Sequence, residues 1–347
     1  MIKISFAWVA ILVMFSACTP RNELGFGAPA PSATTRDVWV AKFRSDMPTT
    51  SRAAPPRPEA GSFERLRVSI PPTHVPGTIE WPDGTPDATT DFVTVGKTQY
   101  SSGNALARGI AAADRSGLNE TMLFVHGYNM RHGEAVYQLA QLSEDFGVTT
   151  PTVLFSWPSA GVGVGYIYDR DSVLISRDWL EQVILDLAQD RNRRILLVGH
   201  SMGSQLIMET LRQIELSGSL DIARSINGVV LMAPDIDAEL FRAQAASLDS
   251  FPDPFILMVA EQDRALSLSS FLAGFRPRLG SQTDRSAVRD LPVSVVDVSS
   301  LSDGGAFDHQ ISTTSPAAIS ILRKLAEETP PGQANVGELV VLADPSG

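Results

Sequence analysis

Cysteine and histidine are both scarce in this chain. The single cysteine, Cys18, among 347 residues excludes an internal disulfide and any metal centre built on several thiolates. Five histidines leave few candidates for a general base: His74, His126, His132, His200 and His309.

A cluster of basic residues is lacking as well. The 28 lysines and arginines are outnumbered by 39 acidic residues, which gives a formal net charge of -11. This balance argues against binding to nucleic acid or to an anionic membrane surface. Hydrophobic residues make up 44% and charged residues 19%, so a chain disordered over its whole length is excluded.

The first residues form a short apolar run. Lys3 precedes the mostly apolar stretch Ile4–Phe15, which is typical of a secretory signal and too short for a permanent membrane span. The run ends in Phe15-Ser16-Ala17-Cys18, which resembles the cleavage box of bacterial lipoproteins. We therefore predict a signal peptide over 1–17 and lipidation at Cys18. The alternative is an ordinary secretory signal with an incidental cysteine.

The residue after the cysteine bears on location. Thr19 stands where Asp would resemble an inner-membrane retention signal, so the outer membrane is favoured. Acyl chains on Cys18 would anchor the protein stably. We expect a lipid-anchored protein of the cell envelope with its folded domain in the periplasm.

Composition divides the remaining chain into three parts. Residues 18–36 are rich in Pro, Ala, Thr and Ser and are predicted to form a flexible tether. Residues 37–328 are predicted to form the folded domain. Residues 329–347 are predicted to be a loose tail, in which Gly337–Ala343 is a weak strand candidate.

Strand and helix patterns alternate through the domain. Short apolar runs predict strands at Val38–Phe43, Arg65–Ile70, Phe92–Val95, Met122–Val125, Thr152–Phe155, Ile195–Val198, Gly228–Met232, Phe255–Val259 and Val293–Val298. Amphipathic spacing predicts helices at Gly133–Phe146, Ser172–Asp190, Ser201–Ile214, Ala238–Ala246 and Pro316–Glu327. This alternation indicates an α/β fold with a mainly parallel sheet. The first strands are too close in sequence for crossover helices, so we expect them to be antiparallel at one edge.

A nucleophile candidate lies between a predicted strand and a predicted helix. The segment Gly199-His200-Ser201-Met202-Gly203 has the pattern G-x-S-x-G in that context. Such a sharp turn strains the backbone at the serine, and the flanking glycines leave room for it. Ser201 is therefore the candidate nucleophile. The alternative is a serine that only caps the helix.

A serine needs a base, and in this arrangement the base follows it in the chain. His309 is the one histidine downstream of Ser201, in a segment with two glycines. The alternative is a surface histidine in a flexible loop.

Four carboxylates compete for the role of orienting that histidine. Asp263 comes just after the strand Phe255–Val259 and is favoured, with Asp235 next. Asp235 and Asp237 are alternatively helix-capping residues. Asp308 adjoins His309, and adjacent side chains rarely align for this bond.

The segment after strand Met122–Val125 is the candidate oxyanion loop. Gly127 lets the backbone turn, so we expect the amides of Tyr128 and Met202 to bind the developing oxyanion. His126 is expected to pack within this loop and His200 beside the serine. His132 is expected to be solvated or to lie at the entrance, and His74 is assigned to a loop.

Further residues are predicted to line the substrate site. Asn129 belongs to the oxyanion loop, and Trp157 and Tyr166 to a glycine-containing loop that follows a strand end. Phe241 is a candidate wall within a small cap at Ala233–Ser250. The alternative for the glycine-containing loop is an ordinary surface loop. No large lid is expected.

From Val38 to Glu327 the chain resembles the bacterial esterase/lipase-like α/β-hydrolases catalogued as a domain of unknown function. The resemblance rests on Arg65–Pro71, Phe124–Asn129, Leu154–Ser159, Gly199–Gly203 and Asp263–Leu266. It implies an α/β-hydrolase fold, and it places Ser201, Asp263 and His309 at the triad positions. It implies no particular substrate.

We predict a serine hydrolase that acts on short or medium acyl esters through an acyl-enzyme. No metal, nucleotide or flavin motif is present, so no cofactor is expected. One alternative is a lipid-anchored binding or assembly protein that retains the fold without turnover. An amidase or peptidase is another, because a triad does not distinguish esters from amides.

Overall fold

The structure is a computed structural model that describes residues 23–43, 61–261, 263–282, 288–299, 314–315 and 340–341. The predicted signal peptide, Cys18, His309 and the predicted helix Pro316–Glu327 lie outside the described residues.

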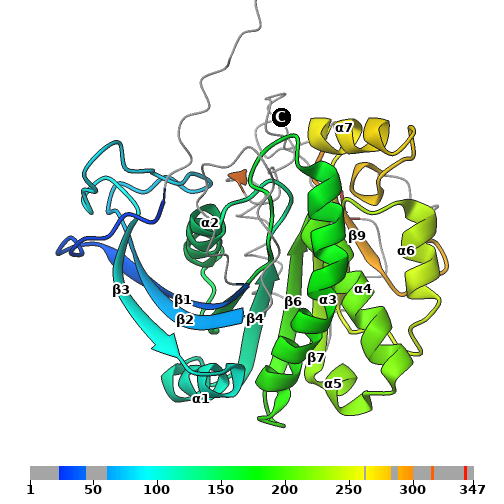
Figure 1. Ribbon diagram of the computed structural model, residues 1–347, viewed down its shortest axis with the longest axis horizontal. Coiled ribbons are helices and arrows are strands. Elements are labelled where there is room, and N and C mark those ends of the chain that lie inside the picture. The colour runs from blue at the N-terminus through cyan, green and yellow to red at the C-terminus, as the bar shows by residue number, and fades with distance from the viewer. Residues whose placement is uncertain are drawn as a thin grey trace, which may run out of the picture.

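One mainly parallel sheet organises the described chain, with strand order β10-β9-β8-β7-β6-β4-β5-β1-β2-β3 (Figure 1). The strands are β1 (Thr34–Phe43), β2 (Gly61–Ile70), β3 (Val93–Tyr100), β4 (Glu120–Val125), β5 (Thr152–Ser156), β6 (Arg194–His200), β7 (Ile226–Met232), β8 (Phe255–Val259), β9 (Ser294–Asp297) and β10 (Val340–Val341). β2 pairs antiparallel with both β1 and β3, and β1 joins the parallel part through β5. The predicted antiparallel edge is thereby confirmed.

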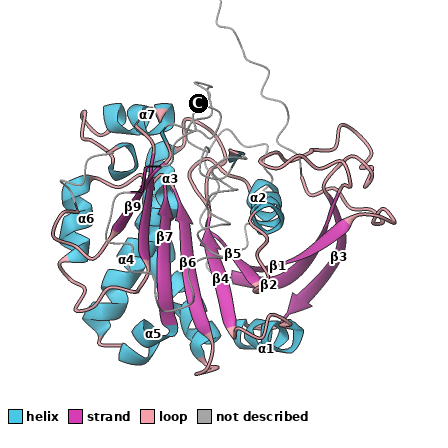
Figure 2. Cartoon of the chain, turned by 180° about the vertical axis from the view of Figure 1, so that it is seen from behind, coloured by secondary structure: helices cyan, strands magenta, loops and turns pink. Residues whose placement is uncertain are grey.

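Helices cover both faces of this sheet (Figure 2). They are α1 (Gly103–Ala113), α2 (His132–Asp145), α3 (Tyr166–Ala188), α4 (Met202–Ser217), α5 (Leu220–Ser225), α6 (Ala238–Ala245) and α7 (Arg264–Leu272), with a short 3-10 helix η1 (Leu279–Ser281).

Alternation along the strands explains the two layers. Successive strand side chains point to opposite faces. Leu123 and Val125 of β4 belong to the core cluster that contains residues of α1, α3, α4 and α6, whereas Met122 and Phe124 belong to the cluster that contains residues of α2. The central strands are therefore apolar on both faces, as their continuous apolar runs predict.

Three helices were not predicted, namely α1, α5 and α7, and α3 begins earlier than predicted. Ser102 caps α1 by accepting from the Ala105 amide at 3.2 Å, and the alanine-rich helix has a narrow apolar face. α3 begins at Tyr166 instead of Ser172, because exposed apolar residues such as Ile167 (63% exposed) blur its pattern. α7 follows directly after Asp263.

The structure differs from the prediction at both ends of the domain. Part of the predicted tether lies against β3, because Thr94 donates to the Gly25 carbonyl and accepts from the Gly27 amide. Leu24 also packs on the core, and β1 begins at Thr34 rather than near Val38. In the tail, the weak strand candidate contains β10, where Val340 pairs with Val296.

Among the described helices, none combines the length and apolar character needed to cross a membrane.

Candidate active site

Ser201 lies at the turn between β6 and α4 with an unusual backbone conformation. Its φ is 53° and its ψ is -121°, a combination that costs free energy in a residue with a side chain. The Ser201 amide donates to the Met232 carbonyl at 2.9 Å, and the Ser201 carbonyl accepts from the Ser204 amide at 3.0 Å. The turn is thus held from β7 and from the first turn of α4.

Three glycines allow this turn to pack closely. A Cβ added at Gly203 would lie 2.2 Å from the Val125 carbonyl oxygen, and one at Gly199 would lie 2.9 Å from the Ser204 amide nitrogen. At Gly127 an added Cβ would lie 3.1 Å from the Ser201 Cβ. The glycine requirement of the G-x-S-x-G pattern is therefore steric, and the loop after β4 lies directly beside Ser201.

The two predicted oxyanion residues flank the serine. Met202 is fully buried and is the first residue of α4, where the helix dipole favours negative charge. Tyr128 follows Gly127, which adjoins Ser201. The structure therefore brings both residues beside Ser201 from different elements.

His126, the first residue of the loop after β4, packs on Trp157. Their rings stack with centroids 4.8 Å apart, and the Trp157 indole donates to the His126 carbonyl at 2.8 Å. Burial lowers the pKa of His126 to about 4, so the imidazole is neutral near pH 7. His126 packs within the loop as expected. Trp157 is 2% exposed and supports the loop instead of presenting its ring to a substrate.

Asp169, in the first turn of α3, ties two loops together. Its Oδ2 accepts from the Asn129 amide at 3.0 Å and from the Ser159 hydroxyl at 2.7 Å. Its Oδ1 accepts from the Ala160 amide at 2.6 Å. Asp169 is fully buried, so these bonds are shielded from water. Asn129, predicted as a lining residue, has a φ of 58° and contributes its backbone to this contact.

Tyr166 and Tyr128 contact each other beside this loop. Their rings meet edge to face at 5.5 Å, and the Tyr128 hydroxyl donates to the Gly163 carbonyl. The Tyr166 hydroxyl donates to Asp235 at 3.1 Å. Burial, and then the charge of Asp235, raises the pKa of Tyr166, so the phenol stays protonated.

Asp235 has a structural partner. Arg278 lies 3.1 Å from its Oδ1, and the Ser269 hydroxyl donates to the same oxygen at 2.8 Å. Both members of this ion pair are nearly inaccessible to water. Asp237 caps α6 by accepting from the Glu239 amide at 2.9 Å, the alternative considered from the sequence.

Asp263 is fully buried at the start of α7, after β8. Its Oδ1 accepts from the Leu266 amide at 2.9 Å. A carboxylate offers about four acceptor positions, so this bond leaves capacity for another donor. β8 is separated from β6 by β7 alone, which places Asp263 at the carboxyl edge that carries Ser201.

Two predictions made from the sequence are wrong, those for Phe241 and His132. Phe241 packs on Phe255, the first residue of β8. Phe255 lies four residues before the carboxyl end of its strand, about 13 Å along it. Phe241 is therefore a core residue away from Ser201 and forms no wall of the site.

His132 is also not solvated at an entrance. Its Nδ1 lies 3.1 Å from the Ser156 hydroxyl, and its Nε2 lies 3.4 Å from Glu64. Burial raises the pKa of Glu64, but hydrogen bonds and charge from His132 and Lys97 outweigh it and lower that pKa to about 2. These contacts join the start of α2 to the antiparallel strands β2 and β3.

The sequence reasoning missed Asp169 and Arg278. A weak signal existed for Asp169, because acids are favoured in the first turn of a helix. That signal was hidden because the predicted helix began after it. Arg278 had no local signal, since its partners come from α3, α7 and the segment after β7.

The family model described as alpha/beta hydrolase of unknown function (DUF900) matches residues 105–326, a range that includes Ser201 and Asp263. The chain belongs to this family. The resemblance seen in the sequence is therefore confirmed, and the fold is that of an α/β-hydrolase. No curated protein matches the chain.

Solved structures with a similar arrangement include hydrolases. Aspergillus fumigatus lipase B is 14% identical, with a TM-score of 0.44, over 68% of this chain and 60% of the lipase chain. Dienelactone hydrolase from Anabaena variabilis is 11% identical, with a TM-score of 0.39, over 78% of this chain and 91% of its own. The carboxylesterase EstE1 from a metagenomic library is 13% identical, with a TM-score of 0.32, over 86% and 90%. These low similarities carry no assignment of function to this chain.

Proposed function

We propose that this α/β-hydrolase is a serine esterase of the cell envelope, with Ser201 as nucleophile, His309 as base and Asp263 as the orienting acid. The observation that carries the proposal is the strained backbone of Ser201, at φ 53° and ψ -121°, between β6 and α4. Such strain persists only where surrounding structure enforces it, and it is concentrated at functional sites.

In the proposed acylation step, the Ser201 hydroxyl oxygen attacks the ester carbonyl carbon while His309 accepts the hydroxyl proton. The carbonyl oxygen becomes an oxyanion, stabilised by the amides of Tyr128 and Met202. Each such donor is worth about a hundred- to thousandfold in rate. The tetrahedral intermediate then collapses, and the leaving alcohol takes the proton from His309.

In the proposed deacylation step, water attacks the acyl-Ser201 ester and His309 accepts a proton from that water. Collapse breaks the bond to the Ser201 oxygen, releases the carboxylic acid and returns the proton to Ser201. Asp263 holds the imidazole in the required tautomer and stabilises its protonated form. The engagement of Asp235 with Arg278 supports Asp263 for this role.

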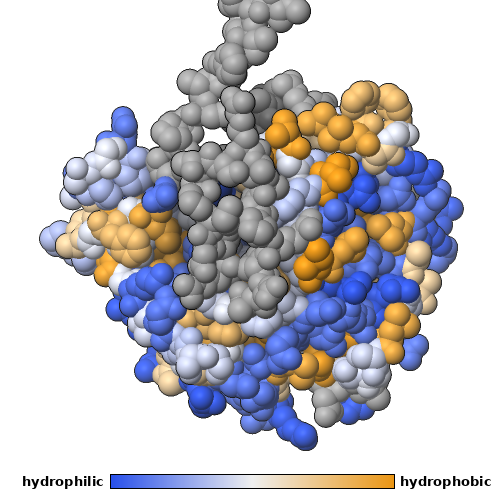
Figure 3. All heavy atoms as spheres, in the orientation of Figure 1, coloured by the Kyte–Doolittle hydropathy of each residue, from blue (hydrophilic) through white to orange (hydrophobic). Residues whose placement is uncertain are grey.

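Short or medium acyl esters are the proposed substrates. Apolar side chains are exposed beside the site, with Val164 at 96% and Ile167 at 63% exposure. Figure 3 shows apolar surface over the upper part of α3 and over α7, where Phe271 is 58% exposed. An apolar acyl or aryl group fits these surroundings better than a charged one.

A second proposal concerns location: Cys18 carries lipid and residues before the domain tether it to the membrane. The short distance in sequence between Cys18 and Gly25, which accepts a hydrogen bond from Thr94 of β3, would keep the domain near the bilayer surface.

The experiment compares the wild type with Ser201→Ala on nitrophenyl esters of increasing acyl length and on peptide nitroanilides. We expect ester turnover that falls with long acyl chains and is lost in the variant, with little peptide cleavage. Faster peptide cleavage would favour the amidase alternative. A folded wild type without turnover on either panel would favour the non-catalytic binding protein.

A further inference from the structure

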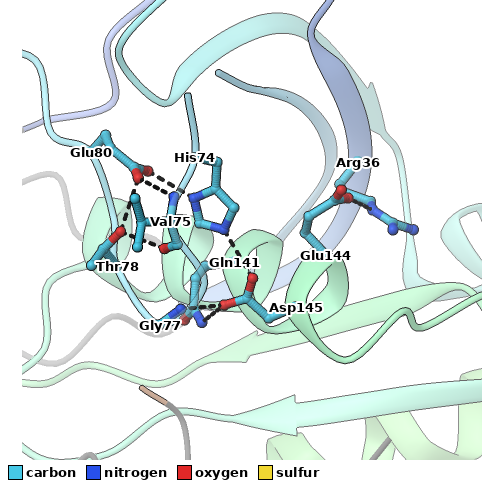
Figure 4. Close-up of polar contacts among 9 residues, drawn as sticks. All are labelled: Arg36, His74, Val75, Gly77, Thr78, Glu80, Gln141, Glu144 and Asp145. Carbon is cyan, nitrogen blue, oxygen red and sulfur yellow. Dashed lines mark hydrogen bonds and ion pairs between the residues drawn. The ribbon is translucent and has the colours of Figure 1, made fainter. Parts of the chain in front are cut away.

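His74, in the loop that joins β2 to β3, lies between two carboxylates (Figure 4). Its Nδ1 is 2.9 Å from Glu80 Oε2, and its Nε2 is 2.9 Å from Asp145 Oδ1 at the end of α2. The side chains of His74 and Asp145 are 9% and 1% exposed. We call His74, Glu80 and Asp145 the His74 cluster.

The same carboxylates also hold the loop backbone. Glu80 Oε1 accepts from the Val75 amide at 2.8 Å, and Asp145 Oδ2 accepts from the Gly77 amide at 2.8 Å. Gln141, one turn earlier on α2, donates to Asp145 as well. The His74 cluster therefore fixes the path of residues 74–80 relative to α2.

The cluster is built for a charged imidazole. Burial lowers the pKa of His74, but hydrogen bonds and charge from Asp145 and Glu80 outweigh it and raise that pKa to about 9. The third neighbour of the ring is Phe92, edge-on at 5.4 Å, which carries no charge. Near pH 7 both carboxylates thus share one imidazolium.

Gly77, held by this cluster, contacts a segment from the other end of the chain. Its φ is 86°, and an added Cβ would lie 1.7 Å from the Thr314 carbonyl oxygen. Thr314 and Ser315 are drawn as the short orange segment above α2 in Figure 1. Thr314 is five positions after His309 in the sequence, so the chain between them can span at most about 18 Å.

We propose that the His74 cluster is a positioning device for the catalytic base, because it holds Gly77 against Thr314, five positions after His309 in the sequence. The inference depends on the proposed function, since it takes His309 as the base. His74 and Gly77 are positioning residues that act through Thr314 and touch no substrate.

The chain offers a matched pair of glycine substitutions to test this. Gly77→Ala and Gly84→Ala both force alanine into a positive φ, which is 86° at Gly77 and 96° at Gly84. Thr314 lies against Gly77, whereas an added Cβ at Gly84 meets no atom of the described residues within 4 Å. We expect Gly77→Ala to lower kcat on a short nitrophenyl ester at least about tenfold with KM changed less than about twofold. Gly84→Ala should keep the wild-type kcat.

A second pair of variants adds no bulk: one removes a charge of the His74 cluster, and the other removes a neighbouring ion pair. Asp145→Asn removes the charge opposite His74, whereas Glu144→Gln removes the neighbouring ion pair with Arg36 (Figure 4). We expect Asp145→Asn to lower kcat and to slow fluorophosphonate labelling of Ser201, and Glu144→Gln to do neither. His74→Gln should lower kcat in the same way and should remove a fall in kcat above about pH 9 that the wild type shows.

The outcomes are separable from those of the proposed function. Wild-type kcat in folded Gly77→Ala and Asp145→Asn, or equal losses in Gly77→Ala and Gly84→Ala, would overturn the positioning role while leaving Ser201-dependent turnover intact. If Gly77→Ala does not fold, Asp145→Asn and His74→Gln decide the matter. A wild type without Ser201-dependent turnover would overturn the proposed function and this inference with it.

Discussion

Ser201 carries backbone strain at the turn between β6 and α4. The positive φ of Ser201 is enforced by close packing between the start of α4 and the loop after β4. A side chain at Gly203 or at Gly127 would not fit between them. Any larger residue at Gly203 must displace the Val125 backbone. The geometry of the nucleophile is therefore a property of three segments and not of the helix cap alone.

The competition between Asp263 and Asp235 is decided by comparing their asparagine variants. Asp263→Asn should lower kcat by about 10³- to 10⁴-fold with little loss of stability, because an amide favours the wrong imidazole tautomer. Asp235→Asn should instead destabilise the fold by about 3–5 kcal/mol, because it leaves Arg278 buried without its charge partner. Ester turnover and urea unfolding of both variants provide the measurement. The reverse pattern would transfer the acid role to Asp235.

Local sequence predicts some of these residues and not others, for a physical reason. Ser201 was recognisable because its steric requirements lie within five consecutive residues. Asp169 and His74 also bind partners 40 and 71 residues away, and a local pattern could not predict those contacts. His74 was assigned to a loop correctly, but its burial between two carboxylates depends on the position of α2.

At the scale of elements, the loops after β4 and β5 depend on α3. Asp169 binds both loops from its buried position in the first turn of that helix. Asp169→Asn should lower kcat by about 10- to 100-fold, because an amide group cannot accept all three hydrogen bonds and the oxyanion loop shifts.

Asp171→Asn, two residues further along α3, is the control, and it should keep the wild-type rate. Stopped assays with a short nitrophenyl ester would measure both variants. An unchanged kcat in Asp169→Asn would show that the loop holds its position without α3.

The His74 cluster should also make folding stability depend on pH. The pKa of His74 in the folded protein, about 9, is above its ordinary value of 6.5, so folding favours the protonated form. Its contribution, at most about 3 kcal/mol, is fully present below pH 6.5 and is lost as pH rises through 9.

Urea unfolding at about pH 6 and about pH 9.5 should show a larger drop for wild type than for His74→Gln. Equal drops in the two proteins would mean that folding does not raise the pKa of His74.

The order of the strands in the sheet was harder to predict from the sequence than the positions of the strands. Apolar runs predicted nine strands near their observed positions, because buried parallel strands need continuous apolar residues. The parallel pairing of β1 with β5 and the packing of Leu24 and Gly25 against the domain are long-range events. A proline- and alanine-rich segment therefore looked like a tether although part of it pairs with β3.

For the whole molecule, anchoring is the prediction that sequence alone supports. Expressed in a bacterial host, Cys18→Ala should lose labelling by a fatty-acid analogue and move from the membrane to the soluble fraction. Turnover by the released protein should persist, because the site lies within the folded domain. Membrane retention and labelling that survive in Cys18→Ala would rule out the lipoprotein hypothesis.

The central claim is that Ser201 is an activated nucleophile in this α/β-hydrolase. Intact-mass spectrometry after fluorophosphonate treatment tests it most directly, with wild type, Ser201→Ala and His309→Ala compared. The account predicts one adduct per wild-type chain, mapped to Ser201, none in Ser201→Ala and far slower labelling in His309→Ala. A folded wild type that stays unmodified, or an adduct that persists in Ser201→Ala, would contradict it.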